Sequence, residues 1–188
     1  LRSLAIHEAA FGPDHPELAV ALVNLSILYS DLGRYEEAEE AYLRALAIRE
    51  AALGLDHPDL LGALGAGSQL YSDRAQYAKA DSVLKREMKI AESVFGPDHP
   101  RIAARLNNLA NNNLEMARYD EVEPLYLRAR AILEEALGPA HPDTAYPMLN
   151  LAIFYTLMGR YDKAGPLLAG VLEIREAALG PDHPDVAY

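Results

Sequence analysis

The chain has 188 residues, a formal net charge of -11 and no cysteine. Without cysteine there can be no disulfides and no thiolate chemistry. The acidic balance disfavours a nucleic-acid partner, which would need clustered lysine and arginine. No apolar run approaches the roughly 20 residues that cross a bilayer. We therefore expect no membrane partner and place the chain in the cytoplasm.

One short phrase recurs at a constant step along the whole sequence. It reads Gly-Pro-Asp-His-Pro in three copies and varies slightly in the other two, and its glycines are 42 residues apart. The copies begin at Gly12, Gly54, Gly96, Gly138 and Gly180. Glycine after an apolar helical run is a stop signal, because it accepts positive φ, and proline in a first turn is a start signal. Each copy is therefore predicted to end one helix and begin the next.

Between the phrases, apolar residues recur at helical spacing, which predicts two helices in every repeat. In the first copy, one run ends at Gly33 and the next ends at Gly54. We expect first helices near 16–32, 58–74, 100–116 and 142–158, and second helices near 34–53, 76–95, 118–137 and 160–179. No segment predicts a strand. The expected fold class is an all-α solenoid of antiparallel helix pairs.

The unbroken period predicts one solenoid domain over residues 1–188, because a single helix pair cannot bury its apolar face without neighbours. We expect full repeats at 16–57, 58–99, 100–141 and 142–183, with partial repeats at 1–15 and 184–188. Residues 1–11 match the end of a second helix, and residues 184–188 match the start of a first helix. These matches predict a fragment of a longer array, and the exposed ends of such an array could self-associate.

Two positions near the start of each second helix are expected to pack between helices. One position holds tyrosine in every repeat, and the other holds a small residue or valine. They are Tyr35, Tyr77, Tyr119 and Tyr161, and Ala38, Ala80, Val122 and Ala164. We expect the tyrosines to fill the gap at the turn rather than to form a stacking ladder for bases. The small residues should let the two helices approach closely.

The motif residues of the first copy resemble a known family. They are Asn24-Leu25-Ser26, Tyr29, Gly33-Arg34-Tyr35, Ala38 and Tyr42-Leu43-Arg44-Ala45. This pattern is similar to the tetratricopeptide repeat, and the 42-residue period with its Ala-Ile-Arg-Glu connector resembles the kinesin light chain type. The resemblance implies a right-handed superhelix. Its first helices would line a concave face that holds an extended or helical peptide.

The resemblance also implies which side chains face the groove. They are Val20, Val23, Asn24 and Ile27 in the first repeat, Gln69 in the second, Asn107, Asn108 and Asn111 in the third, and Tyr146, Leu149, Asn150 and Ile153 in the fourth. Asn24, Asn108 and Asn150 share one repeat position, and asparagine can both donate to and accept from a peptide backbone. The open alternative is that each asparagine ties adjacent repeats together. The third repeat adds Asn112 and Asn113, and we favour a polar contact surface there over a drifted repeat.

The recurring histidines do not predict a metal site. They are His15, His57, His99, His141 and His183. Neighbouring repeats should lie roughly 10 Å apart, too far for two imidazoles to share a zinc ion at about 2 Å. We expect them to cap or pack the starts of first helices. No carboxylate pair or glycine motif has the context of catalysis or phosphate binding, so we expect no enzyme activity and no cofactor.

These observations favour a non-enzymatic protein-interaction scaffold that binds a peptide or protein segment in its concave groove. The alternative is a structural or regulatory arm of a larger multidomain signalling protein. Such an arm would act by intramolecular contact or by self-association through its ends. The sequence flanking residues 1 and 188 would distinguish the two.

The second repeat is predicted to be the least stable. Gly62, Gly65 and Gly67 lie inside its first helix, and each costs up to about 1 kcal/mol relative to alanine. Glu87 also stands where Ala45 stands in the first repeat. Amide hydrogen exchange should therefore show the lowest protection in the helix near 58–74. The highest protection in that helix would contradict the prediction.

Overall fold

The structure is a computed structural model that describes residues 12–13, 15–180 and 183. Its elements are α2 (Pro16–Asp31), α3 (Tyr35–Leu53), η1 (Pro58–Leu60), α4 (Leu61–Asp73), α5 (Tyr77–Phe95), α6 (Pro100–Glu115), α7 (Tyr119–Leu137), η2 (Pro142–Thr144), α8 (Ala145–Leu157) and α9 (Tyr161–Leu179). The described residues form no strand, so the predicted all-α class is confirmed. Residues 1–11 of the partial repeat expected at 1–15, and the whole of the one expected at 184–188, lie outside the described residues.

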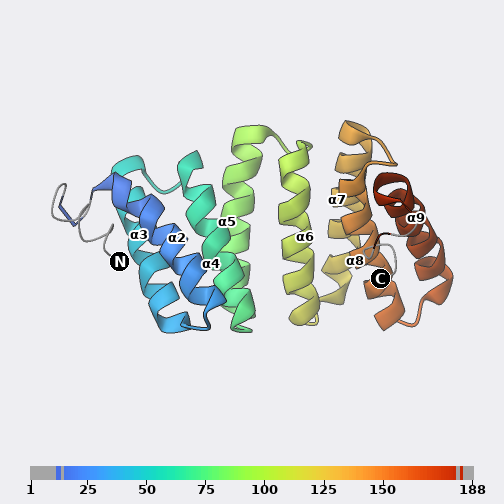
Figure 1. Ribbon diagram of the computed structural model, residues 1–188, viewed down its shortest axis with the longest axis horizontal. Helices are drawn as coiled ribbons and strands as arrows, with labels where there is room; N and C mark the ends of the chain where they lie inside the picture. Colours follow the sequence, from blue (N-terminus) through green and yellow to red (C-terminus); the bar gives the residue numbers. More distant parts are fainter. Residues whose placement is uncertain (1–11, 14, 181–182, 184–188) are drawn as a thin grey trace. The chain divides into compact units, whose positions relative to one another are not determined.

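The helices belong to two compact units, Leu1–Val94 and Phe95–Tyr188. In the first unit, α2 packs against α3, and both contact α4. In the second unit, α6 packs against α7 and α8 against α9, while α6 and α7 both contact α8 (Figure 1). First helices of consecutive repeats are therefore neighbours within each unit. None of the described helices has both the length and the hydropathy needed to span a bilayer.

The recurring phrase ends and begins helices as predicted. The α3 helix ends at Gly54, whose φ of 91° lies in the region that favours glycine. At the next start, the Nδ1 atom of His57 accepts a hydrogen bond of 3.2 Å from the backbone N–H of Asp59. The same cap is present at His15, His99 and His141, so the expected capping role is confirmed for these histidines. No group of histidine and carboxylate side chains among the described residues could hold a metal ion.

The positions expected to allow close helix approach are buried, and the expected turn tyrosines are not. Ala38, Ala80 and Val122 are fully buried, and Ala164 is 3% exposed. The prediction was wrong for Tyr119 and Tyr161, which are 45% and 68% exposed. Side chains of a helix tilt toward its N-terminus, so a residue at the first position reaches out over the turn instead of into the helix pair.

A polar network joins the two repeats of the first unit. The Glu39 carboxylate of α3 accepts hydrogen bonds from the Tyr71 hydroxyl at 3.1 Å and from Arg74 at 2.6 Å. Lys79 donates to the same carboxylate at 2.8 Å. The hydrogen bond from Lys79 contributes most to lowering the pKa of the Glu39 carboxyl, which therefore stays ionised at neutral pH.

The second unit repeats this network with the equivalent residues. Glu123 of α7 accepts from the Tyr155 hydroxyl at 2.7 Å, from Arg160 at 3.0 Å and from Lys163 at 3.3 Å. The hydrogen bond from Tyr155 is the largest cause of the lowered pKa of Glu123. In both units, then, the second helix of one repeat holds the first helix of the next through one carboxylate.

One glycine of the second repeat is required by packing. Gly67 of α4 lies directly against the ring of Tyr42, and a Cβ added at Gly67 would stand 2.3 Å from a ring carbon. The Tyr42 side chain is 2% exposed and cannot move aside without disturbing the core. Gly67 is therefore costly for the isolated helix but necessary for the contact between repeats.

This contact predicts opposite effects for two glycine substitutions. Gly67→Ala should lower the free energy of unfolding by about 1–3 kcal/mol, because it overpacks the Tyr42 site. The control is Gly62→Ala, at an exposed position of the same helix, where an added Cβ comes no closer than 3.8 Å to another side chain, and it should raise stability by up to about 1 kcal/mol. Urea denaturation of both variants checks this. Equal effects of the two substitutions would contradict the packing argument.

Candidate functional site

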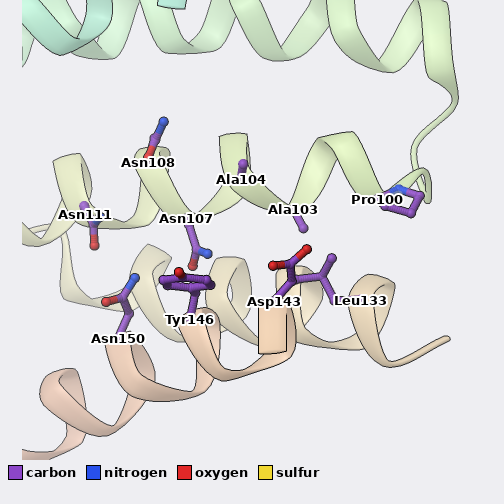
Figure 2. Close-up of a pocket in the computed structure, with 10 residues that line it drawn as sticks. All are labelled: Pro100, Ala103, Ala104, Asn107, Asn108, Asn111, Leu133, Asp143, Tyr146 and Asn150. Atoms are coloured by element: carbon purple, nitrogen blue, oxygen red, sulfur yellow. The ribbon is translucent and has the colours of Figure 1, made fainter. Parts of the chain in front are cut away.

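The second unit carries a cavity of about 370 Å³ between the α6 and α8 helices. We call it the asparagine cavity because amide side chains supply most of its polar groups. Figure 2 shows side chains from the two helices facing each other across it. Its lining residues are Pro100, Ala103, Ala104, Asn107, Asn108, Asn111, Leu133, Asp143, Tyr146 and Asn150.

Helical periodicity brings these side chains to one surface. On α6 the lining residues recur every three or four positions, from Pro100 to Asn111, which is the spacing of one helix face. Asp143, Tyr146 and Asn150 have the same spacing on η2 and α8. Because first helices of consecutive repeats are neighbours, the two stripes lie opposite each other. The cavity is thus a product of the repeat pattern.

A buried tyrosine orients one of the amides. The hydroxyl of Tyr126, on α7, donates a hydrogen bond to the Oδ1 atom of Asn111. The Tyr126 side chain is 1% exposed, and burial raises its pKa to about 12, so the hydroxyl stays protonated at neutral pH. With its oxygen held in this way, Asn111 keeps its NH₂ group as a donor for a ligand.

The amide of Asn107 differs from that of Asn111, because its oxygen has no hydrogen-bond donor within the described part of the chain. Its Oδ1 atom is shielded from solvent and accepts no hydrogen bond from the described residues. A buried polar atom without a partner costs about 1–3 kcal/mol. In Figure 2, the Asn107 side chain points toward Tyr146, which is 60% exposed and free to change rotamer. A donor group of a ligand that reached this oxygen would satisfy it.

The cavity has one carboxylate and no lysine or arginine in its lining. The carboxylate belongs to Asp143, whose side chain is 59% exposed. The imidazole of His141 lies near it, with 3.8 Å between Nδ1 and the Asp143 oxygen. Among the described residues, Asp143 forms no ion pair with lysine or arginine. The electrostatic character of the cavity is therefore polar and weakly negative.

The structure brings together part of the residue set expected from the sequence. Asn107, Asn108, Asn111, Tyr146 and Asn150 line the cavity. The other two expected residues of the second unit do not. Leu149 packs against the core, and Ile153 is 46% exposed further along α8.

The expected residues of the first unit lie on α2 and α4. Val20 and Ile27 are 52% and 47% exposed, and Asn24 is also exposed. Val23 packs against the core of its unit instead. Gln69 is exposed and donates a hydrogen bond of 2.7 Å to Asp73. These side chains do not line the asparagine cavity.

The sequence favoured a polar contact surface that includes all the asparagines of the third repeat. The structure does not place all of them on such a surface. Asn112 and Asn113 are 3% and 0% exposed. They lie on the side of α6 that faces the protein interior, where Asn113 donates to the Glu121 carboxylate at 3.1 Å. The alternative of asparagine ties also lacks support, since no hydrogen bond among the described residues links Asn24, Asn108 or Asn150 to a neighbouring repeat.

Sequence reasoning missed some of the residues that line the cavity. Pro100 and Asp143 were not among the residues expected to face the groove, yet they continue the two stripes by one turn toward the N-terminus. Extending the helical spacing backwards could have found them. Leu133 comes from α7, a second helix, and no signal in the repeat pattern indicates it.

The paired helices and the 42-residue period agree with the comparison with known families. Two family models, both described as tetratricopeptide repeat, match the chain. One matches residues 1–51, 20–93, 68–135 and 106–164, and the other matches residues 144–185. Proteins of this family are generally protein-interaction modules and are typically non-catalytic. No curated protein matches the chain significantly.

Solved structures share the same fold. The kinesin light chain TPR-like repeats of Podosopora anserina align with a TM-score of 0.81 at 24% identity, over 95% of this chain and 84% of that one. BtubC (BKLC) from P. vanneervenii aligns with a TM-score of 0.78 at 23% identity, over 90% and 68%. Aspartyl phosphate phosphatase F from Bacillus subtilis aligns with a TM-score of 0.71 at 19% identity, over 87% and 41%. The chain belongs to the tetratricopeptide repeat family, with helices paired as in kinesin light chain repeats.

Proposed function

We propose that the chain is a non-enzymatic protein-interaction scaffold, and that its asparagine cavity binds a segment of polypeptide. The unpaired Oδ1 atom of Asn107 carries the proposal. It is an acceptor without a donor, set among three further amides that line the same cavity. A polypeptide backbone offers N–H donors and C=O acceptors in every residue.

The spacing of the amides suits an extended segment. Asn107 and Asn111 are one helical turn apart, a rise of about 6 Å. Two residues of an extended chain cover about 6.6 Å. Side chains one turn apart on α6 can therefore meet alternate residues of a segment that runs along the helix. Asn107 would accept from one backbone N–H, and Asn111 would donate to a backbone carbonyl.

The other end of the cavity is apolar. Ala103, Ala104 and Leu133 provide a surface without hydrogen-bonding side chains. Small side chains on α6 leave room there for an apolar side chain of the bound segment. A volume of about 370 Å³ is at the small end of the range for ligand sites, which fits a few residues of a longer partner.

A double substitution tests the proposal. Peptides that bind the chain would be selected from a displayed random library, and their affinities measured by fluorescence anisotropy. Asn107→Ala combined with Asn150→Ala should weaken binding about tenfold, because each lost hydrogen bond contributes about 0.5–1.5 kcal/mol. Asn24→Ala is the control, since Asn24 holds the repeat position of Asn150 but lies on α2. Unchanged affinity in a double variant with a native circular dichroism spectrum would refute the assignment.

A second candidate function is association through α9. Leu168 holds the repeat position of Tyr42 and Tyr126, which are 2% and 1% exposed, yet it is 43% exposed itself. Leu172, one turn further along the same helix, is 42% exposed. At the position of Leu168 in the first repeat, α4 covers the side chain, because Gly67 lies against the Tyr42 ring. A further helix, from this protein or from a second copy, would cover this surface in the same way.

Light scattering distinguishes a second copy from other occupants of the α9 surface. If copies associate there, the mean mass should rise with protein concentration, and Leu168→Gln with Leu172→Gln should abolish the rise. The reason is that burial of each leucine contributes roughly 1.5–3 kcal/mol. A constant monomer mass across the concentration range would count against self-association.

A further inference from the structure

We infer that the asparagine cavity selects segments that place a lysine or arginine side chain beside Asp143 and Tyr146. The inference rests on the proposed function, and it names the chemical class of the bound segment. Both residues line the cavity. They are three positions apart, and Figure 2 shows them on the same side of it.

Asp143 and Tyr146 provide a carboxylate and a tyrosine ring, two of the three groups of an arrangement that occurs elsewhere in the protein. In the first unit, Lys79 pairs with the Glu39 carboxylate at 2.8 Å, and its Nζ atom lies 4.9 Å from the centre of the Tyr71 ring. A carboxylate and a tyrosine ring together hold one ammonium group. Asp143 and Tyr146 offer the same two groups to the cavity, and no lysine or arginine among the described residues pairs with this carboxylate.

The second unit contains the same arrangement. Lys163 pairs with Glu123 at 3.3 Å and lies 4.9 Å from the centre of the Tyr155 ring. An ammonium group is attracted both to a carboxylate and to the face of an aromatic ring. A cation at Asp143 would therefore gain two contacts, and its aliphatic stem would lie along the apolar part of the cavity.

The charges near the cavity oppose an acidic segment. The arginines of α6 are occupied elsewhere: Arg101 lies 4.9 Å from the centre of the Phe95 ring, and Arg105 donates to the Arg101 carbonyl at 2.7 Å. Neither lines the cavity. The net charge of -11 adds a field that attracts cations at long range. That general field has to be separated from local recognition in any test.

The chain contains a matched control for this purpose. Asp59 holds the repeat position of Asp143, follows the equivalent histidine cap and stands 3.8 Å from His57 Nδ1. Its side chain is 68% exposed, and it does not line the asparagine cavity. Asp59→Asn and Asp143→Asn change the net charge equally. Only Asp143→Asn should change the local preference. The backbone caps remain in both variants, because the histidines accept from backbone N–H groups.

The probes are pools of capped ten-residue peptides. Each pool has one central residue fixed as lysine, arginine, glutamine, norleucine or glutamate, with neutral residues at random elsewhere. Fluorescence anisotropy at physiological salt measures binding to the chain. The lysine and arginine pools should bind about threefold to tenfold more tightly than the glutamine pool. Asp143→Asn should abolish this preference, Asp59→Asn should retain it, and Asp143→Lys should shift it to the glutamate pool.

Other results would overturn the inference. A preference of the native chain for glutamate or norleucine would contradict it, and so would an equal loss of preference in Asp59→Asn, which would indicate the general field alone. The Asn107→Ala, Asn150→Ala double variant separates the two proposals. If it weakens every pool while no cation preference exists, the cavity binds polypeptide but the cation assignment is wrong. If it weakens none, or if no pool binds, both proposals fail.

Discussion

Each first helix begins where a histidine Nδ1 atom accepts the backbone N–H two residues later, and the rest of the structure depends on this constraint. The histidine precedes a proline that starts the helix, and glycine ends the helix before it. Because start and stop recur every 42 residues, equivalent residues of successive repeats face the same way. The two facing stripes of the asparagine cavity follow from this register. A shift of one residue at His141 would turn Tyr146 and Asn150 about 100° around the helix axis.

Between these fixed ends, the repeats conserve packing and vary their surfaces. The carboxylate–tyrosine–lysine network of Glu39 recurs at Glu123, because it joins helices in both units. The turn between the two helices of a repeat does not require glycine. Gly33 has a φ of 71° there, and the equivalent Ala75 has a φ of 54°. Ala75 therefore carries the strain of a left-handed residue with a Cβ. Exposed positions on the first helices carry no packing role, so they are available for recognition.

The lining of the asparagine cavity combines the groups that the proposed polypeptide ligand would need. Amides with opposite hydrogen-bonding roles stand at Asn107 and Asn111, beside a small apolar area and a single carboxylate. Under the proposal, the paired amides would bind a backbone of any sequence, and the carboxylate and the ring of Tyr146 would add a preference for a basic side chain. The same pairing of carboxylate and tyrosine holds lysines within the protein. These ion pairs within the chain thus indicate how Asp143 would hold a cation of a partner.

The sequence by itself determined the helices, their caps and the two helix stripes that contain five of the cavity residues. These features depend on local spacing and on the repeat period. Only the tertiary structure decided which side chains are covered. It buried Asn112 and Asn113, left Tyr119 and Tyr161 exposed, and placed Leu133 of α7 in the cavity. The physical reason is that burial depends on the neighbouring helix. A helix pattern indicates that two residues share a face, but not which parts of that face a neighbour covers.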